Sequence, residues 1–200
     1  MAHFKQIIRI AISIILLSSF TYAKSFSYDT AHSNVGFTVS HMVVTKVHGS
    51  FNKVDADLFW NPKNLKKSYL NGTISVASIN TKNEKRDNHL QDKEFFNSDE
   101  FPTITFKSTS IKAIKSESNT YTLKGKLTIK DVTKTISCPL KTKGPIIDPW
   151  NNERIGFEAT CNIKRMDYNI YENNTLKSGE LIIGDDIAIT ISVEGIAKAN

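Results

Sequence analysis

The stretch TYTLKGKLTIK (residues 120–130) alternates between two kinds of side chain along its whole length. Threonine and lysine occupy every second position, and the positions between them hold Tyr121, Leu123, Gly125, Leu127 and Ile129. A period of two residues places alternate side chains on opposite faces of a β-strand. This stretch therefore predicts a strand with one face in an apolar interior and a lysine-rich face in water.

Similar alternation extends through most of the chain on both sides of this stretch. It recurs in residues 35–41, 155–163 and 187–193, and further strand-like runs cover 49–60, 69–79, 102–114 and 133–142. Turn sequences such as NPKN, SESNT and DPWNN separate these runs. We expect one all-β domain of about eight strands, because the sequence contains no linker or repeat that divides it.

Strands with one apolar face pack as a sandwich or close into a barrel, and the residue pattern alone leaves both open. Inward positions mix small residues such as Gly125 and Ala159 with large ones such as Phe106 and Phe157. This mixture is compatible with a cavity, which an eight-stranded barrel can hold, and equally with close interdigitation of the side chains.

Residues 80–102 interrupt the alternation with a dense group of charged side chains. Thr81 and Glu84 have the spacing of a capping box, which predicts a helix over residues 82–91. A second short turn is expected to carry Phe95 and Phe96. The sequence therefore predicts one helical insertion at residues 82–96.

The predicted helix places Arg86, His89 and Leu90 on one face, because these residues are three and four positions apart. Two interpretations of the charged group remain open. Arg86 and Asp87 pair with neighbouring strands and lock the helix to the barrel end, or they line a mouth and meet the polar group of a ligand.

The first residues predict export. MAHFKQIIR carries Lys5 and Arg9 without an acid, an apolar run follows, and the small residue Ala23 ends the segment TYA. This is the layout of a signal peptide over residues 1–23, and the run is about half the roughly 20 residues that a membrane-spanning helix needs. We therefore expect a soluble periplasmic protein with one domain over residues 24–200.

The charge pattern excludes one class of partner. The formal net charge is +6, but the lysines are scattered along the strands and form no basic patch with aromatic residues beside it. Nucleic-acid binding is therefore not expected. A mild positive field is compatible with transient contact with a membrane surface.

The two cysteines, Cys138 and Cys161, are predicted to form a disulfide, as expected in an oxidising compartment. They are equally distant from a turn centred near Pro149 and Trp150. Antiparallel pairing across that turn places them opposite each other, about 4.5–5.5 Å apart at Cα, which is within disulfide range.

Four segments together resemble the YceI-like family of bacterial periplasmic polyisoprenoid-binding proteins. They are YDTAHSNVGFTVSHMVVTKVHGSF, SVASINTKNEKRDNHLQDKEFFNSDEFPTITFKS, GKLTIKDVTK and RMDYNI, and the resemblance runs from Tyr28 to Glu194. Asp131, Thr135, Tyr168 and Asn169 depart from the family pattern, and these positions lie in turns and a rim strand.

The resemblance implies an extended, antiparallel, lipocalin-like β-barrel with a hydrophobic pore. Members of the family bind long-chain amphiphiles such as isoprenoids and are not established enzymes. We therefore expect a lipid carrier, store or chaperone without cofactor, bound metal or catalytic residues, with an amphiphilic lipid as its partner. A homodimer is compatible with the sequence, which does not determine the oligomeric state.

The expected pore divides into a polar mouth and an apolar wall. Arg86, Asp87, His89 and His41 are predicted to hold the head group of the ligand. The predicted wall for the tail consists of Phe37, Val39, Phe106, Leu123, Leu127, Phe157, Ile189 and Ile191. For each of these wall residues, plain core packing is the alternative.

Two other functions are compatible with an all-β chain. A lipid-modifying enzyme would use histidines at the barrel mouth, but no metal-binding or nucleophile motif is present. A small outer-membrane barrel would turn its apolar face outward and need aromatic girdles, whereas the aromatic residues here lie in the middle of strands. An apolar interior is therefore favoured.

Overall fold

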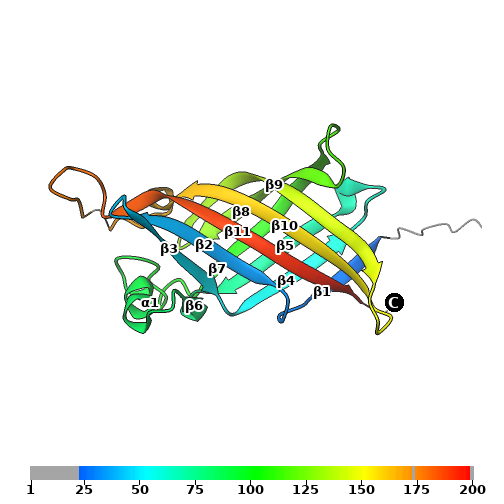
Figure 1. The fold of residues 1–200 in the computed structure, drawn as a ribbon, viewed down its shortest axis with the longest axis horizontal. Coiled ribbons are helices and arrows are strands. Elements are labelled where there is room, and N and C mark those ends of the chain that lie inside the picture. Colours follow the sequence, from blue (N-terminus) through cyan, green and yellow to red (C-terminus); the bar gives the residue numbers. More distant parts are fainter. Residues whose placement is uncertain (1–22, 173, 199–200) are drawn as a thin grey trace, which may run out of the picture.

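Eight antiparallel strands close into an elongated barrel in the computed structural model of the protein, which describes residues 23–172 and 174–198 (Figure 1). The predicted signal peptide lies outside the described residues, except for Ala23. In spatial order the barrel strands are β1 (Lys24–Tyr28), β4 (Val54–Trp60), β5 (Tyr69–Ser75), β7 (Thr103–Ala113), β8 (Thr120–Ile129), β9 (Val132–Ile147), β10 (Glu153–Lys164) and β11 (Ile183–Ala197). The barrel closes where β1 pairs with β11, with Phe26 opposite Ala197. This confirms the predicted barrel and excludes the sandwich.

A second set of strands extends the wall at one end. β2 (Asn34–His41) pairs with the first part of β11, β3 (Thr45–Phe51) pairs with β2, and the short β6 (Ile79–Asn80) pairs with β3. β6 has no ladder to β7 in the described residues. The helix α1 (Glu84–Gln91) lies at this end, beside β6 (Figure 1).

The break between β3 and β4 divides a run that the alternation predicted as one strand over residues 49–60. At the break, the Asn52 N–H donates to the Ser78 carbonyl and the Lys53 N–H to the Ser78 hydroxyl. The backbone therefore bonds to the short 3₁₀ turn η2 (Val76–Ser78) here, and the strand bends.

The two faces of the barrel wall have the polarity that the alternation predicts. Leu123, Leu127 and Ile129 are buried, whereas Lys124 and Lys126 are exposed on the same strand. The outer face therefore carries lysines, unlike the apolar band that faces lipid in an outer-membrane barrel. Among the described residues, no helix has the length and apolarity needed to cross a membrane.

The helix begins two residues later than the capping box predicted. Lys82 has a φ of 60°, which is the left-handed region and does not continue into a helix. Asn83 is the N-cap, and its side-chain oxygen accepts from the Arg86 N–H at 3.0 Å. Thr81 is therefore not the cap and is free for the contacts described below.

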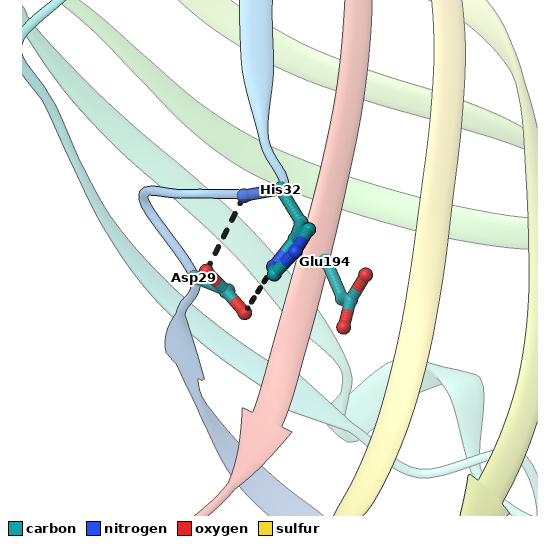
Figure 2. Close-up of side chains that lie close together, drawn as sticks. All are labelled: Asp29, His32 and Glu194. Atoms are coloured by element: carbon teal, nitrogen blue, oxygen red, sulfur yellow. Dashed lines mark hydrogen bonds and ion pairs between the residues drawn. The ribbon is translucent and has the colours of Figure 1, made fainter. Parts of the chain in front are cut away.

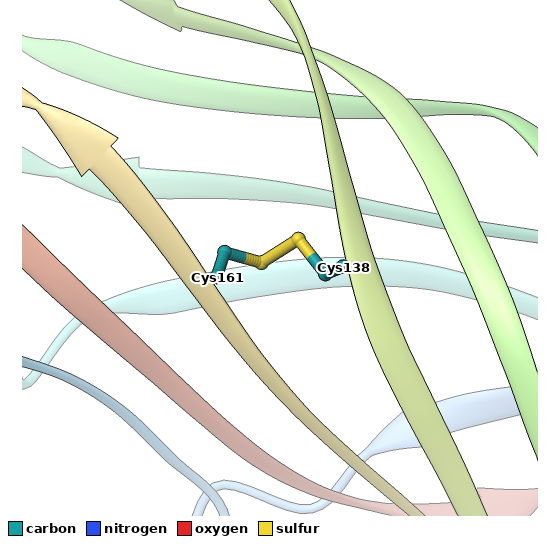
Figure 3. The surroundings of a disulfide bond; sticks show 2 residues. All are labelled: Cys138 and Cys161. Carbon is teal, nitrogen blue, oxygen red and sulfur yellow. A yellow bond between two sulfur atoms is a disulfide. The ribbon is translucent and has the colours of Figure 1, made fainter.

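The disulfide forms at the predicted register. Cys138 and Cys161 are bonded and their Cα atoms lie 5.0 Å apart on β9 and β10 (Figure 3). Near the turn Arg154 pairs with Ile146, and a bulge before the Gly156–Lys143 pair moves the register by one residue. That shift brings the cysteines into opposition, and a loop of this size contributes about 3 kcal/mol of stability.

Candidate apolar cavity and barrel mouth

The barrel interior holds two neighbouring cavities of about 160 and 100 Å³. The larger one lies toward the α1 end and is lined there by Leu90, Phe95 and Phe96. The smaller one reaches toward the opposite end, where Tyr28 and Leu58 line it. Several aliphatic and aromatic residues line both, so that one apolar bore runs along the barrel: Val35, Ile74, Ile104, Phe106, Leu123, Leu127 and Ile191.

All eight residues that the sequence predicted for the pore wall line these cavities. Seven line the larger one, and Phe157 lines the smaller one. Phe37, Val39 and Ile189 point into the interior and are nevertheless only partly buried, as expected of side chains beside empty space. Their contact with the tail of a ligand remains a prediction.

Arg165 is the one charged residue in the wall of the larger cavity, and sequence reasoning missed it. It is 3% exposed and donates from Nε, Nη1 and Nη2 to the carbonyls of Gly184, Ile170 and Ile183 at 2.7–3.0 Å. Burial lowers the pKa of this guanidinium, and the carboxylates of nearby acids oppose that shift. Its polar atoms face the backbone, so the side chain ties the 3₁₀ turn η3 (Arg165–Tyr168) to the start of β11.

A hydrogen-bond network joins Arg86 and Asp87 through Thr81. The Thr81 hydroxyl accepts from Arg86 Nε at 2.7 Å and donates to Asp87 Oδ1 at 2.5 Å. Arg86 Nη2 also donates to the Thr81 carbonyl at 2.8 Å, and Asp87 Oδ1 accepts from the Thr81 N–H. Arg86 Nη1 makes no hydrogen bond to any described residue. The network orients the guanidinium and leaves one of its edges available.

The two histidines predicted at the mouth are not brought together with Arg86 by any hydrogen bond in the described part of the chain. His89 is exposed on α1, and its ring packs edge-on against Phe95 with centroids 4.9 Å apart. His41 ends β2 and is partly exposed opposite Ile183. Arg86, Asp87, His89 and His41 do not line the two cavities, and their role toward a head group remains a prediction.

A second charged cluster lies where the barrel closes. Arg154 on β10 donates to Asp148 Oδ2 at 2.6 Å, Asp29 Oδ2 at 2.8 Å and Glu194 Oε1 at 2.5 Å. Asp29, His32 and Glu194 lie close together at this point, and His32 Nδ1 is 3.0 Å from Asp29 Oδ2 (Figure 2). Both carboxylates already hold the guanidinium of Arg154, so the geometry is that of an ion-pair cluster.

This cluster explains the first of the four quoted segments. Asp29 Oδ1 accepts from the N–H groups of Ala31 and His32 in the turn between β1 and β2. The Ser33 hydroxyl accepts from the Glu194 N–H at 2.9 Å on β11. Asp29, His32 and Ser33 therefore hold the turn between β1 and β2 against β11.

The closed antiparallel barrel and its apolar bore place this protein in the class of lipocalin-like barrels. Within that class, the chain belongs to the YceI-like family, because the model of the YceI-like domain matches residues 26–195. A UPF0312 protein of Yersinia enterocolitica is 36% identical over 165 residues, which cover 82% of this chain and 81% of the relative.

Two solved structures are similar in fold. Burkholderia cenocepacia BcnA superimposes with a TM-score of 0.73 at 23% identity, covering 84% of this chain and 98% of that protein. A polyisoprenoid binding domain from Saccharophagus degradans has a TM-score of 0.65 at 15% identity and covers 88% and 99% of the two chains. At these identities the likeness establishes the fold.

Proposed function

We propose that this protein binds the tail of a long-chain isoprenoid or similar amphiphile in its apolar bore and acts as a carrier, store or chaperone for it. The observation that carries the proposal is the predominantly aliphatic and aromatic wall of two neighbouring cavities. Each methylene that leaves water gains about 0.8 kcal/mol, so a tail prefers the bore to the aqueous phase. The polyisoprenoid binding of the Saccharophagus domain supports this choice of ligand.

The polar head of such a ligand remains at the mouth. The larger cavity, which lies nearest the mouth, offers little to a polar group, since Arg165 is the one charged residue in its wall and donates to backbone carbonyls. A head group drawn inside would lose its hydration without replacement. The helical insertion stands at this end, and Arg86 with its available Nη1 is our proposed partner for the head, with Asp87, His89 and His41 around it.

We propose a binding protein and not an enzyme. Its cavity holds apolar side chains where a reaction would need a nucleophile or base. The signal peptide predicted over residues 1–23 supports work in the periplasm, where a carrier would shield an isoprenoid between membranes.

Native mass spectrometry of the protein purified from its own periplasm tests the binding proposal. We expect an additional mass that fits an isoprenoid lipid and disappears after denaturation and refolding in detergent-free buffer. Readdition of an isoprenyl phosphate to the refolded protein should restore a one-to-one complex. A protein that is isolated empty and takes up no isoprenyl lipid would refute the proposed function.

Transient membrane contact is proposed for the tip between β2 and β3. Met42, Val43 and Val44 are 40, 65 and 84% exposed, and the turn is closed by the Val44 N–H donating to the His41 carbonyl. Met42 and Val43 have φ values of 50° and 63°, at positions that favour asparagine and glycine. These apolar side chains are largely exposed although their backbone positions are strained, and a bilayer offers them a partner.

Replacing Met42 with Asn and Val43 with Gly is expected to abolish sedimentation with zwitterionic vesicles while keeping or raising thermal stability. The new residues suit the turn and remove the apolar surface. A variant with Ile147 replaced by Thr serves as control, because it removes an exposed apolar side chain at the end of β9. Unchanged vesicle binding would show that the tip does not contact membranes. A change in oligomeric state without a change in vesicle binding would instead assign the tip to a homodimer interface.

A further inference from the structure

Phe106 lies at the boundary between the two cavities. Its side chain lines both of them and is only partly buried. It packs against the core cluster that contains Leu123 and Phe157, and also against the cluster that contains Leu127 and Tyr168. The ring therefore stands where a tail would pass from the larger cavity into the smaller one.

Gly125 provides the space that the Phe106 ring occupies. Gly125 is buried on β8 and faces inward between Leu123 and Leu127. A Cβ added to Gly125 would lie 2.2 Å from Phe106 Cζ and 2.4 Å from Cε2, far inside contact distance. The ring is thus seated against the glycine in the wall, and a side chain at position 125, which faces inward, would displace it toward the bore.

We infer that Phe106, seated on Gly125, determines how long a tail the barrel accepts. This inference rests on the proposed function and adds the residue pair that sets its specificity. With the ring against the wall, the two cavities form one bore that takes a long tail. With the ring displaced, the bore ends at position 106 and the tail is confined to the larger cavity near α1.

The inference predicts the shape of a chain-length profile. Each methylene buried should raise affinity about fourfold, which corresponds to about 0.8 kcal/mol, until the tail reaches the end of the accessible bore. Beyond that length, affinity should stay constant. Prenyl phosphates that differ only by whole isoprene units, titrated below their critical micelle concentration, locate this break for each variant by calorimetry.

Gly125→Ala is expected to move the break to a shorter tail while short tails bind as before. Phe106→Ala should leave the break at its wild-type length, because the seated ring does not block the bore, and Phe106→Trp, which keeps Gly125, should shorten it by a second route. Gly156→Ala is the matched control, because its added Cβ has ordinary contacts, the nearest at 3.5 Å to Lys143 Cβ, and it lies outside both cavities.

A double variant separates the effect of the Phe106 ring on tail length from a general loss of stability. The added Cβ of Gly125→Ala also lies 2.8 Å from the Lys107 carbonyl oxygen, so this variant is expected to be less stable. Combining it with Phe106→Leu removes the ring contact and keeps the backbone contact, so the break should return toward its wild-type length without recovery of stability. A break that stays in place in all variants, or that Gly125→Ala moves equally with and without the ring, would overturn the inference. Wild-type protein that binds no prenyl phosphate of any length would overturn the proposed function and this inference with it.

Discussion

Arg86→Ala is expected to weaken binding of an isoprenyl phosphate about 10- to 150-fold and to leave binding of a headless hydrocarbon of equal length unchanged. A charge-assisted hydrogen bond contributes roughly 1.5–3 kcal/mol, which converts to that range of affinity. A planar guanidinium suits phosphate because its N–H groups donate in parallel. In the structure, Arg86 Nε and Nη2 are bound to Thr81, and Nη1 is left for such a contact.

The contacts with Thr81 also define the competing outcome. If Arg86 serves only as a lock that holds α1 to β6, its removal should lower the melting temperature of the ligand-free protein and weaken both ligands equally. Lys85→Ala is the matched control, since it removes a cation from the same helix at an exposed position. Equal loss for the phosphate and the hydrocarbon in Arg86→Ala would refute the assignment of the head group to this residue.

Thr81→Val offers an independent check on the network. It removes the hydroxyl that accepts from Arg86 and donates to Asp87 but keeps the guanidinium. A head-group role predicts partial loss of phosphate binding, because the guanidinium is present but less well oriented. A purely structural role predicts the same fall in melting temperature as in Arg86→Ala.

The strands and the inward faces could be predicted because each depends on local alternation. Residues 120–130 show this well, since β8 covers Thr120–Ile129 with the expected side buried. The register of Cys138 and Cys161 also followed from counting outward from one turn. The strand pairs nearest the turn are offset by one residue from this count. The prediction agrees with the structure because the bulge before Gly156 removes that offset.

Other features were beyond sequence reasoning because they depend on contacts between distant segments. The hydrogen bonds of Arg165 reach Ile170 and the start of β11, and nothing in RMDYNI distinguishes a buried arginine from a surface one. The helix start was misplaced because Thr81 and Glu84 match a capping box, whereas Asn83 is the actual cap and accepts from the Arg86 N–H. The choice between the two caps is decided by backbone geometry, here the positive φ of Lys82.

Arg154→Ala is expected to destabilise the protein, and most strongly near neutral pH, because Arg154 joins the segments that close the barrel. Arg154 joins Asp29 in the β1–β2 turn, Asp148 in the β9–β10 turn and Glu194 on β11. The side chains of Asp148 and Asp29 are only 4 and 11% exposed, so removing the guanidinium leaves two nearly buried carboxylates without their cation. A fall in melting temperature of roughly 10 °C is expected.

The pH dependence of this effect follows from the pKa values of the two aspartates. A hydrogen bond with His32, opposed by burial and supported by Arg154, lowers the pKa of Asp29 to about 2. Burial opposes ionisation of Asp148, but hydrogen bonds from Arg154, Asn152 and the Trp150 N–H outweigh it and also set its pKa to about 2. Since both values are below those of the unfolded chain, this stability is present above about pH 4 and is lost as the pH falls toward 2.

Thermal unfolding followed by circular dichroism at a series of pH values measures both effects. Wild type should lose stability steeply between about pH 4 and 2, whereas Arg154→Ala should start lower and change less, so the two curves approach each other in acid. Lys143→Ala is the control, because it breaks an exposed ion pair with Glu158 on the same strand pair and should change little. Parallel curves for wild type and Arg154→Ala would show that the guanidinium does not set the ionisation of these carboxylates, and that the barrel is closed by its backbone pairing alone.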